Sequence, residues 1–261
     1  MLAEVWDRIG DNRMITIKNV EEIAVMRRAG RIVAEVFELM REKIRPGITT
    51  GELDMLAERL IRKRGAVPLF KGYNGFPGTL CMSVNEQVIH GIPGKLVLQE
   101  GDIVSVDVGA RIDGFCGDAA RTFAVGRIAP EVQRLLDVTE ESLNAGIGQA
   151  VIGNRIGDIA HAVQTVAEAA GYGVVRDYTG HGIGRDLHEA PDVPNYGTPG
   201  RGLRLVSGMA LAIEPMINMG THQVRELKDG WTVVTLDGKP SAHFENTVAI
   251  TPDGPVVLTV L

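Results

Sequence analysis

Hydrophobic positions recur with a helical period in four segments of the chain. The first covers residues 20–44, where an apolar stripe ends at an Arg-Pro-Gly turn. The second covers residues 50–64, and Thr49 and Glu52 have the spacing of a capping box at its start. Helices are also predicted for residues 130–149 and 156–170.

Apolar and polar residues alternate in other segments, which predicts β-strands. These segments are residues 102–123, 173–178, 209–217, 231–236 and 242–250. The predicted order is helix, helix, strands, followed by helix, helix, strands. This order suggests an internal repeat.

The segment 102–123 reads as a β-hairpin, because Asp113-Gly114 is a strong two-residue turn signal. With these two residues in the loop, Gly109 lies opposite Asp118 and Asp107 lies opposite Ala120. Cross-strand partners share a face, as do residues two apart, so both aspartates point the same way. Two adjacent carboxylates need a cation, a shared proton or open water.

An acid in the second half matches one of these aspartates. Aligning "LVLQEGDIVSVD" with "LRLVSGMALAIE" matches Asp107 with Glu214, each within an apolar strand. A fourth acid, Glu245, alternates with apolar neighbours in the last long strand. A solvated sheet face, or a buried acid paired with an arginine such as Arg121, is the structural alternative for any one of them. Four carboxylates in four strands of one pseudo-symmetric sheet fit a shared site better.

Three of the six histidines lie in glycine-flanked segments. Glycine on both sides lets the backbone approach a ligand closely and leaves the imidazole uncovered. These three are His90, His181 and His188. The other three, His161, His222 and His243, are expected at the surface. A phosphate cradle at "GHGIG" is a weak alternative, because no lysine follows it.

Composition limits the classes of function. The chain has 261 residues and a formal net charge of -6, which argues against strong binding to nucleic acid and makes DNA an unexpected partner. No apolar run is long enough to span a bilayer, and the N-terminal residues do not resemble a secretory signal, so a soluble cytoplasmic protein is expected. Cys81 and Cys116 have no metal-ligand spacing, and nothing nearby marks either as a nucleophile.

Four carboxylates and one imidazole form an oxygen-rich ligand set. Such a set favours two divalent ions such as manganese, iron, cobalt or zinc over a structural zinc site. A pair of ions with a shared water activates hydroxide at neutral pH. The expected chemistry is hydrolysis.

The segments "SVNEQVIHGIPG", "VDVGARIDGFCGDAART", "TGHGIGRDLHEAP", "AIEPM" and "HFENTV" resemble the signature segments of the type I methionine aminopeptidase family. The match is collinear from about residue 15 to the end. It implies the α/β (α+β) pita-bread fold, a pseudo-two-fold antiparallel sheet covered by two pairs of helices. It further implies a dinuclear metal centre and removal of the initiator methionine. We expect a leader at residues 1–14 and one catalytic domain at residues 15–261, with pseudo-repeats at about 15–125 and 126–261.

The resemblance also assigns residues. The implied metal ligands are Asp107, Asp118, His181, Glu214 and Glu245. The implied catalytic residues are His90, His188 and Glu214, and the two histidines would also contact the substrate. The implied lining of the methionine pocket is Tyr73, Phe76, Cys81, Leu187 and Trp231. For the three aromatic residues, an ordinary core role is an equal alternative.

Three alternatives remain open. A proline-specific aminopeptidase shares the fold but usually carries a large N-terminal domain. The type II enzyme has a long insertion between His188 and Glu214, where only 25 residues intervene here. A binding protein of this fold would have lost metal ligands. Under the main hypothesis the partners are nascent polypeptide N-termini and, transiently, the ribosome, and the enzyme is a monomer without membrane attachment.

Overall fold

The computed structural model describes residues 15–261, so the predicted leader at residues 1–14 lies outside the described residues. All four predicted helices are present, and each begins and ends within one residue of its predicted bounds. They are α2 (Val20–Lys43), α3 (Thr50–Lys63), α4 (Pro130–Gly148) and α5 (Ile156–Ala169).

Capping explains where the first two helices begin. The predicted box at α3 is confirmed, because the Glu52 amide donates to Thr49 Oγ1 at 3.2 Å and the Thr49 amide donates to Glu52 Oε2 at 2.9 Å. Asn19 and Glu22 form the same reciprocal pair at the start of α2. These local bonds satisfy amides that have no partner inside the helix.

The strands are more numerous and shorter than predicted. They are β1 (Val67–Pro68), β2 (Leu80–Val84), β3 (Gln87–Ile89), β4 (Ile103–Ile112), β5 (Phe115–Ala124), β6 (Gly173–Val174), β7 (Gly180–Gly182), β8 (Glu189–Val193), β9 (Ala210–Ile213), β10 (Met216–Asn218), β11 (Val224–Glu226), β12 (Val233–Thr235), β13 (Ser241–His243), β14 (Asn246–Thr251) and β15 (Gly254–Val257). A short 3-10 turn, Tyr73–Gly75, lies between β1 and β2.

The register of the β4–β5 hairpin is the predicted one. Gly109 lies opposite Asp118 and Asp107 lies opposite Ala120. Asp113 occupies the left-handed region, with φ of 49°, as the predicted turn requires. The two carboxylates therefore share one face of the hairpin.

The predicted single sheet is wrong in one respect. Asp107 and Asp118 belong to a sheet ordered β1-β4-β2 with β5 on β4, whereas Glu214 and Glu245 flank strands of a second sheet ordered β15-β14-β9-β7-β8. The segment 209–217 is divided at Pro215, which has no amide hydrogen to donate. The segment 242–250 is divided at Glu245, whose amide donates to Ala120 of β5.

Two threonines join β5 to the segment Ser241–Thr251, in place of a regular ladder. Thr247 Oγ1 accepts from the Asp118 amide at 3.0 Å and donates to the Asp118 carbonyl at 2.8 Å. Thr122 Oγ1 does the same with the amide and carbonyl of His243. The two sheets therefore meet through hydroxyl groups beside the acids.

Hydrogen bonds recur at positions that the predicted internal repeat matches. The Gly47 amide donates to the Leu98 carbonyl at 2.8 Å. At the corresponding place in the second half, the Gly153 amide donates to the Leu205 carbonyl at 3.1 Å. An isolated bridge also pairs Thr49 with Val97 in the first half and Arg155 with Arg204 in the second.

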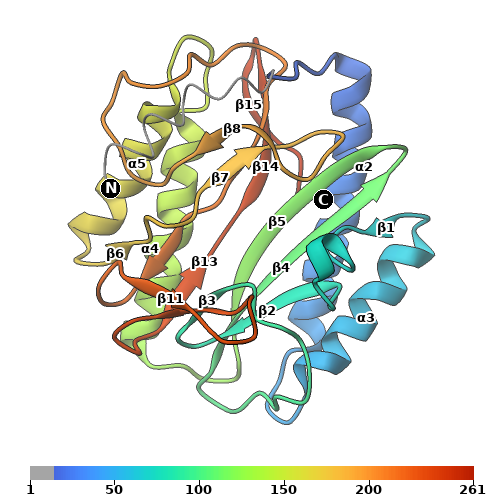
Figure 1. Ribbon diagram of the computed structural model, residues 1–261, viewed down its shortest axis with the longest axis vertical. Helices are drawn as coiled ribbons and strands as arrows, with labels where there is room; N and C mark the ends of the chain where they lie inside the picture. The colour runs from blue at the N-terminus through green and yellow to red at the C-terminus, as the bar shows by residue number, and fades with distance from the viewer. Residues whose placement is uncertain (1–14) are drawn as a thin grey trace.

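The helices lie in two pairs on either side of the central strands. Figure 1 shows α2 beside β4 and β5, with α3 packed next to α2. On the opposite side α4 lies beside β13, with α5 packed against α4. One hydrophobic cluster fills the space under α2 and α3, and a second fills the space under α4 and α5. A third cluster includes residues from both halves, such as Phe76 and Leu187, and it borders the cavity described below. No helix within residues 15–261 is long and apolar enough to cross a membrane.

Candidate metal centre

One cavity of about 270 Å³ brings the predicted site residues together. It is lined by all twelve of them: Tyr73, Phe76, Cys81, His90, Asp107, Asp118, His181, Leu187, His188, Glu214, Trp231 and Glu245. Sequence reasoning missed two further lining residues, Phe70 and Asn74. Both lie in the glycine-interrupted aromatic segment "FKGYNGF", which is the signal that could have identified them.

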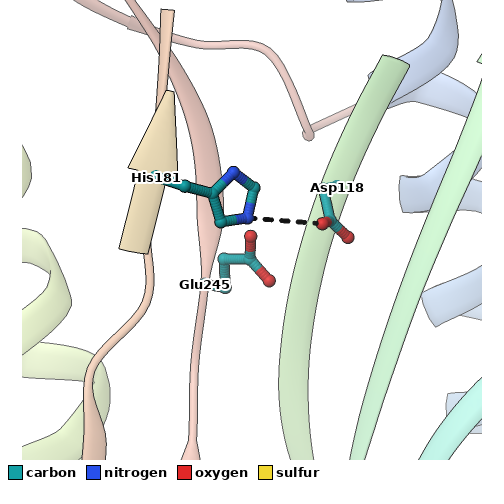
Figure 2. Close-up of side chains that lie close together, drawn as sticks. All are labelled: Asp118, His181 and Glu245. Carbon is teal, nitrogen blue, oxygen red and sulfur yellow. Dashed lines mark ion pairs between the residues drawn. The ribbon is translucent and has the colours of Figure 1, made fainter. Parts of the chain in front are cut away.

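Three of these side chains converge at the polar end of the cavity. Asp118 comes from β5, His181 from β7, and Glu245 from the residue before β14, and Figure 2 shows their polar atoms facing one another. One ligand atom from each lies within 4.8 Å of the others. Nε2 of His181 is 4.0 Å from Asp118 Oδ2 and 3.6 Å from Glu214 Oε1.

The hydrogen bond on the far side of the His181 ring sets its tautomer. Nδ1 donates to the Gly182 carbonyl at 2.9 Å, because a carbonyl can only accept. Burial, and to a smaller extent the neighbouring His188, lower the pKa of His181 to about 3, so the ring is neutral at pH 7. Nε2 therefore presents a lone pair to two carboxylates. The lone pair and the carboxylates together are suited to binding a cation.

The buried carboxylates also require a cation or bound protons. Asp118 and Glu245 are only 4% and 2% exposed, which excludes the solvated-face alternative for both. Asp107 Oδ1, Asp118 Oδ1 and Glu245 Oε1 are buried and have no hydrogen-bond partner. Burial, followed by repulsion between neighbouring acids, raises the pKa of all four carboxyls well above the ordinary range. Without a cation, this cluster would have to hold protons.

No arginine neutralises the cluster in the described part of the chain, so the structural alternative based on Arg121 is wrong. The Arg121 guanidinium donates hydrogen bonds to the backbone carbonyls of Ala120 and Glu245 and to Asn246 Oδ1. It fixes the segment that carries Glu245 without pairing with a carboxylate. The residues present thus fit divalent metal ions, which provide positive charge and accept oxygen and imidazole ligands.

The predicted surface position of His243 is wrong. His243 is 2% exposed, neither ring nitrogen has a hydrogen-bond partner, and Nε2 lies 3.6 Å from Glu214 Oε2. Burial, then the charges of His90 and Arg121, lower its pKa to about 3. The sequence held a signal for this position, because His243 is two residues before Glu245 and such residues share a strand face. His161, in contrast, is exposed as predicted.

The two predicted catalytic histidines both line the cavity. His188 packs against His181, with ring centroids 4.3 Å apart, and its Nδ1 lies 2.8 Å from the Tyr73 hydroxyl. His90 has a left-handed backbone, with φ of 59°, and its ring meets those of Tyr178 and Trp231 edge to face. Burial lowers the pKa of both histidines, that of His90 to about 4.

The apolar part of the cavity contains the predicted pocket residues. Phe76 and Trp231 form an edge-on pair with centroids 5.1 Å apart, and Phe76, Cys81 and Leu187 are buried. Burial, then the charges of the nearby acids, raise the pKa of Cys81 well above its usual value, which supports the prediction that it is not a nucleophile. Tyr73, at 38% exposed, lies at the surface and is not an ordinary core aromatic.

The glycines at positions 180 and 182 in "GHGIG" serve a different structural purpose from the predicted one. A Cβ on Gly180 would lie 2.3 Å from the Ala212 carbonyl oxygen, and one on Gly182 would lie 2.2 Å from that of Ala190. They permit close approach between neighbouring strands of the same chain. The predicted close approach is therefore to backbone of this chain, and His181 lines the cavity between these two glycines.

Comparison with known proteins identifies the family to which the chain belongs. The model of metallopeptidase family M24 matches residues 24–252, and the chain therefore belongs to that family. It is a metal-dependent hydrolase, and its buried Asp, His and Glu cluster is in keeping with divalent metal binding.

The individual relatives narrow this class. A methionine aminopeptidase of Clostridium perfringens is 58% identical over 248 residues, covering 95% of this chain and all of that protein. The crystal structure of a methionine aminopeptidase from Thermotoga maritima matches with a TM-score of 0.93 and 47% identity, covering 95% of this chain and 100% of that one. Within family M24, the chain falls among the bacterial-type methionine aminopeptidases. A prolidase from Pyrococcus furiosus, at 22% identity and a TM-score of 0.76, shares the fold; the match covers 98% of this chain and 68% of that protein.

The stability of the metal-free protein should depend on pH in an unusual direction. Because the folded-state pKa values of the four carboxyls are raised, their stabilising contribution is present below the unfolded-state values of about 4 and is lost as the pH rises through the folded-state values. The melting temperature should fall from about pH 5 toward neutrality. A divalent ion at 100 times its Kd should then restore about 2.7 kcal/mol, or roughly 5–10 °C.

Differential scanning calorimetry across this pH range, with chelator or with Mn²⁺, measures the effect. The gain from Mn²⁺ should shrink at about pH 5, where protons compete for the carboxylates. A gain independent of pH would contradict the assignment of these carboxyls to the ion site.

Proposed function

We propose that this chain removes the N-terminal methionine from proteins whose second residue is small. The observation that carries the proposal is the cavity itself, where unpartnered buried carboxylates and a neutral imidazole lie at one end and an apolar pocket at the other. The names of its close relatives support the same reaction. The proposal joins a hydrolytic centre to a site for one apolar side chain.

The centre would hold two divalent ions, with cobalt, manganese, iron or zinc as candidates. We assign the ligands as Asp107, Asp118, His181, Glu214 and Glu245, of which Asp118 and Glu245 would serve both ions. When bound, such ions lower the pKa of a water molecule toward neutrality and polarise a carbonyl group. The oxygen-rich ligand set supports divalent first-row ions in general and does not select one of them.

Glu214 is the residue that we assign to proton transfer. Its carboxyl lies between His181 and His243, with 3.6 Å separating the nearest atoms on each side, and its side chain is 13% exposed toward the cavity. Burial, then the charge of Asp118, raise its pKa, which suits a base that must later return the proton. It would take a proton from the attacking water and deliver it to the leaving amine.

His188 would stabilise the charge that develops on the scissile carbonyl oxygen. Its lowered pKa keeps the ring neutral, so it has one N–H to donate. If the Tyr73 hydroxyl donates to Nδ1 across the 2.8 Å contact, that N–H is at Nε2. His188 can then donate to the oxyanion. His90, which also lines the cavity, would hydrogen-bond the scissile amide.

The methionine side chain would occupy the apolar end of the cavity. Phe76, Cys81, Leu187 and Trp231 line this end, together with Phe70, and Tyr73 closes it at the surface. An unbranched thioether fits a narrow apolar slot more easily than a branched side chain does. His90 and His188 would border the position of the second substrate residue, which leaves little room there for a large side chain.

The alternatives are less well supported. The 25 residues between His188 and Glu214 leave no room for the insertion that we expect of the type II enzyme. A proline-specific enzyme shares the fold, but the prolidase match reaches only 22% identity. For a binding protein, the retention of all five candidate ligands in one cavity would have no explanation.

The substrates would be nascent polypeptides, which places the enzyme in the cytoplasm. We propose that it acts as a monomer and contacts the ribosome transiently. The reaction requires neither DNA nor a membrane. Ribosome pelleting at low and moderate salt, with the purified enzyme and empty ribosomes, tests this contact.

Specificity should depend on the first two substrate residues. We expect cleavage of Met-Gly, Met-Ala and Met-Ser peptides and little cleavage of Met-Lys or Met-Phe. Leucine at position one should be disfavoured by roughly 1–3 kcal/mol, the range for small changes in an apolar pocket. A formylated N-terminus should block cleavage, because the free amine must approach the carboxylates.

The assay uses metal-free protein with each divalent ion restored in turn, and a peptide set that varies positions one and two. Indifference to the second residue, or efficient release of leucine, would indicate a broad aminopeptidase. Cleavage only before proline would support the proline-specific alternative. No hydrolysis with any ion, together with no metal in the protein after gentle purification, would indicate a binding protein.

A further inference from the structure

The turn formed by residues 184–189 carries two residues of the cavity, Leu187 and His188. It follows β7 and leads into β8, so it positions His188 relative to His181. The ring of His188 is hydrogen-bonded to Tyr73, which is itself partly exposed. The position of His188 therefore depends on what holds the backbone of this turn.

The carboxylate of Glu189 holds the turn from inside. Its Oε1 accepts from the Arg185 amide at 2.8 Å and from the Asp186 amide at 3.3 Å. The Gly184 amide donates to the Asp186 carbonyl at 3.1 Å and closes the turn. Glu189 is the residue directly after His188, so the bonds that hold this carboxylate in the turn also restrain the backbone next to the histidine.

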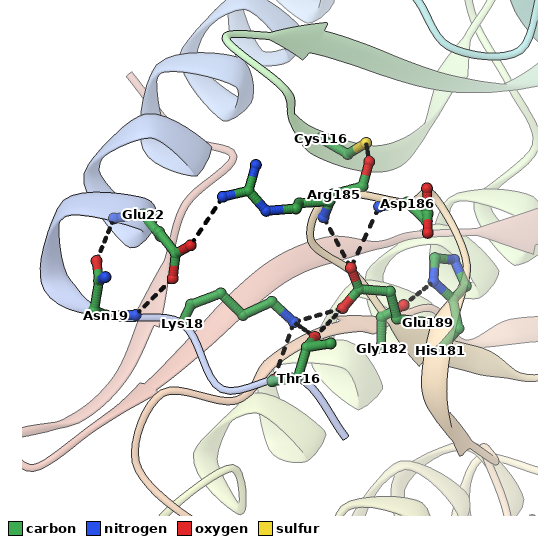
Figure 3. Close-up of polar contacts among 10 residues, drawn as sticks. All are labelled: Thr16, Lys18, Asn19, Glu22, Cys116, His181, Gly182, Arg185, Asp186 and Glu189. Carbon is green, nitrogen blue, oxygen red and sulfur yellow. Dashed lines mark hydrogen bonds and ion pairs between the residues drawn. The ribbon is translucent and has the colours of Figure 1, made fainter. Parts of the chain in front are cut away.

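Lys18 holds the second oxygen of the same carboxylate. Its Nζ lies 2.7 Å from Glu189 Oε2, and the two side chains are only 4% and 9% exposed. Nζ also donates to the carbonyl of Thr16 at 3.2 Å and to its hydroxyl at 2.5 Å, and this hydroxyl donates to Glu189. Figure 3 shows Lys18 reaching from the segment before α2 to the inside of the turn.

The backbone of the 15–19 segment is also fixed. The Lys18 amide donates to the Gly208 carbonyl at 2.7 Å, next to β9. Gly184 leaves room for the pair, because a Cβ there would lie 2.5 Å from Lys18 Cε and 2.6 Å from Glu189 Oε1. The last glycine of "GHGIG" therefore accommodates this ion pair.

The Lys18–Glu189 pair is more deeply buried than the other ion pairs of Lys or Arg with an acid in residues 15–261. Arg28 and Asp113, for example, form an exposed pair whose side chains are 53% and 59% accessible, and such pairs contribute little. A buried pair loses both hydration shells, and removing one partner leaves an uncompensated charge. Burial favours the protonated form of Glu189, but the hydrogen bonds from Lys18 and Thr16 outweigh it and lower the pKa of the carboxyl.

We infer that Lys18 is a positioning residue for His188, acting through Glu189 and the 184–189 turn. The inference rests on the proposed role of His188 in the reaction. Nothing in the proton transfers or in metal binding uses Lys18 or Glu189 directly. Their effect on catalysis passes through the histidine alone, so it disappears when the histidine is absent.

The test combines Lys18→Met with His188→Ala. Methionine keeps the length of the side chain and removes its charge. Lys18→Met should lower kcat about 10-fold with little change in KM, the scale seen when a supporting group of a catalytic residue is lost. In the His188→Ala background the same substitution should lower kcat no further. Arg28→Met is the matched control and should leave kcat unchanged.

A second readout does not depend on activity. Hydrogen exchange of the metal-free protein should show faster exchange in a peptide covering residues 183–189 of the Lys18→Met variant, and not in Arg28→Met. Bound manganese per chain should equal that of the wild type after saturation. If Lys18→Met does not fold, Glu189→Gln serves instead, because it keeps an oxygen for the two turn amides and loses the charge.

Wild-type kcat in the folded variant, or an equal further loss in the His188→Ala background, would overturn the inference. Loss of manganese would also overturn it, because the effect would then pass through the metal centre. If His188→Ala alone keeps full turnover, the proposed role of His188 fails. The exchange experiment then decides separately whether Lys18 holds the turn.

Discussion

Replacing Asp118 by asparagine should lower turnover by about 10³-fold or more, while the protein stays folded. The side chain is 4% exposed, its Oδ1 has no partner, and it faces His181 and Glu245. Asparagine keeps the shape but removes a negative charge and turns an amide donor toward the ligands. Since the bound ions supply several kcal/mol of transition-state stabilisation, losing one of their ligands should remove most of the activity.

The stability of this variant should show whether Asp118 is a metal ligand or a structural acid. Without metal, Asp118→Asn relieves repulsion among buried carboxyls, so its melting temperature should equal or exceed that of the metal-free wild type. The gain on adding Mn²⁺ should be largely lost. Calorimetry, elemental analysis and a Met-Ala-Ser cleavage assay measure the three effects.

Asp113→Asn is the matched control for this experiment. Asp113 lies in the turn of the same hairpin, is exposed, and has a left-handed backbone that asparagine also adopts. It should keep wild-type turnover and metal content. If Asp118→Asn kept two bound ions and near wild-type turnover, Asp118 would not be a metal ligand.

His188→Ala should lower kcat by roughly 10² to 10³, the effect of removing one oxyanion donor. The histidine borders the cavity, and its Nδ1 is occupied by the Tyr73 hydroxyl, which leaves Nε2 for the substrate. Because we assign it no metal ligand role, bound metal per chain should not change. Steady-state kinetics and elemental analysis on the same preparation check both statements.

His181→Ala should behave differently although the two rings are in contact. Its Nε2 faces Asp118 and Glu214, so its removal should lower metal affinity as well as activity. His161→Ala, on the exposed face of α5, is the control and should change neither. Equal metal loss in the His181 and His188 variants would show that the two roles are wrongly assigned.

Local interactions explain why much of the fold could be predicted. The start of α3 follows from the Thr49 and Glu52 capping pair, and the hairpin register follows from the two-residue turn at Asp113. Both signals act over a few residues. The repeat was visible because matched glycines make the same hydrogen bonds in each half, as Gly47 and Gly153 do.

The candidate site could be listed from the sequence for a different reason. Acids inside apolar strands are costly without a partner, so Asp107, Asp118, Glu214 and Glu245 were conspicuous. Flanking glycines drew attention to three histidines, and the family motifs supplied the pocket residues. The structure places all twelve residues around one cavity. Their individual roles stay predictions until the variants are measured.

Predictions failed where a position depends on distant parts of the chain. His243 was expected at the surface because it lies near charged residues in the sequence, yet α4 packs against its strand and Thr122 hydrogen-bonds its backbone. The division of the sheet at Glu245 depends on the carbonyl of Ala120, more than a hundred residues earlier. Neither partner can be recognised from the local pattern.

The sequence by itself determined the helices, the hairpin register, the repeat and the kind of chemistry, because periodicity, turn residues and buried charges are local properties of the chain. Only the tertiary structure decided which partners those charges have. It separated the acids between two sheets, aimed the lone pair of His181 at two carboxylates, and paired Lys18 with Glu189 inside the turn before β8. The physical reason is that a buried charge is stabilised by whatever lies within a few ångströms of it, and that distance is fixed by how the two halves pack.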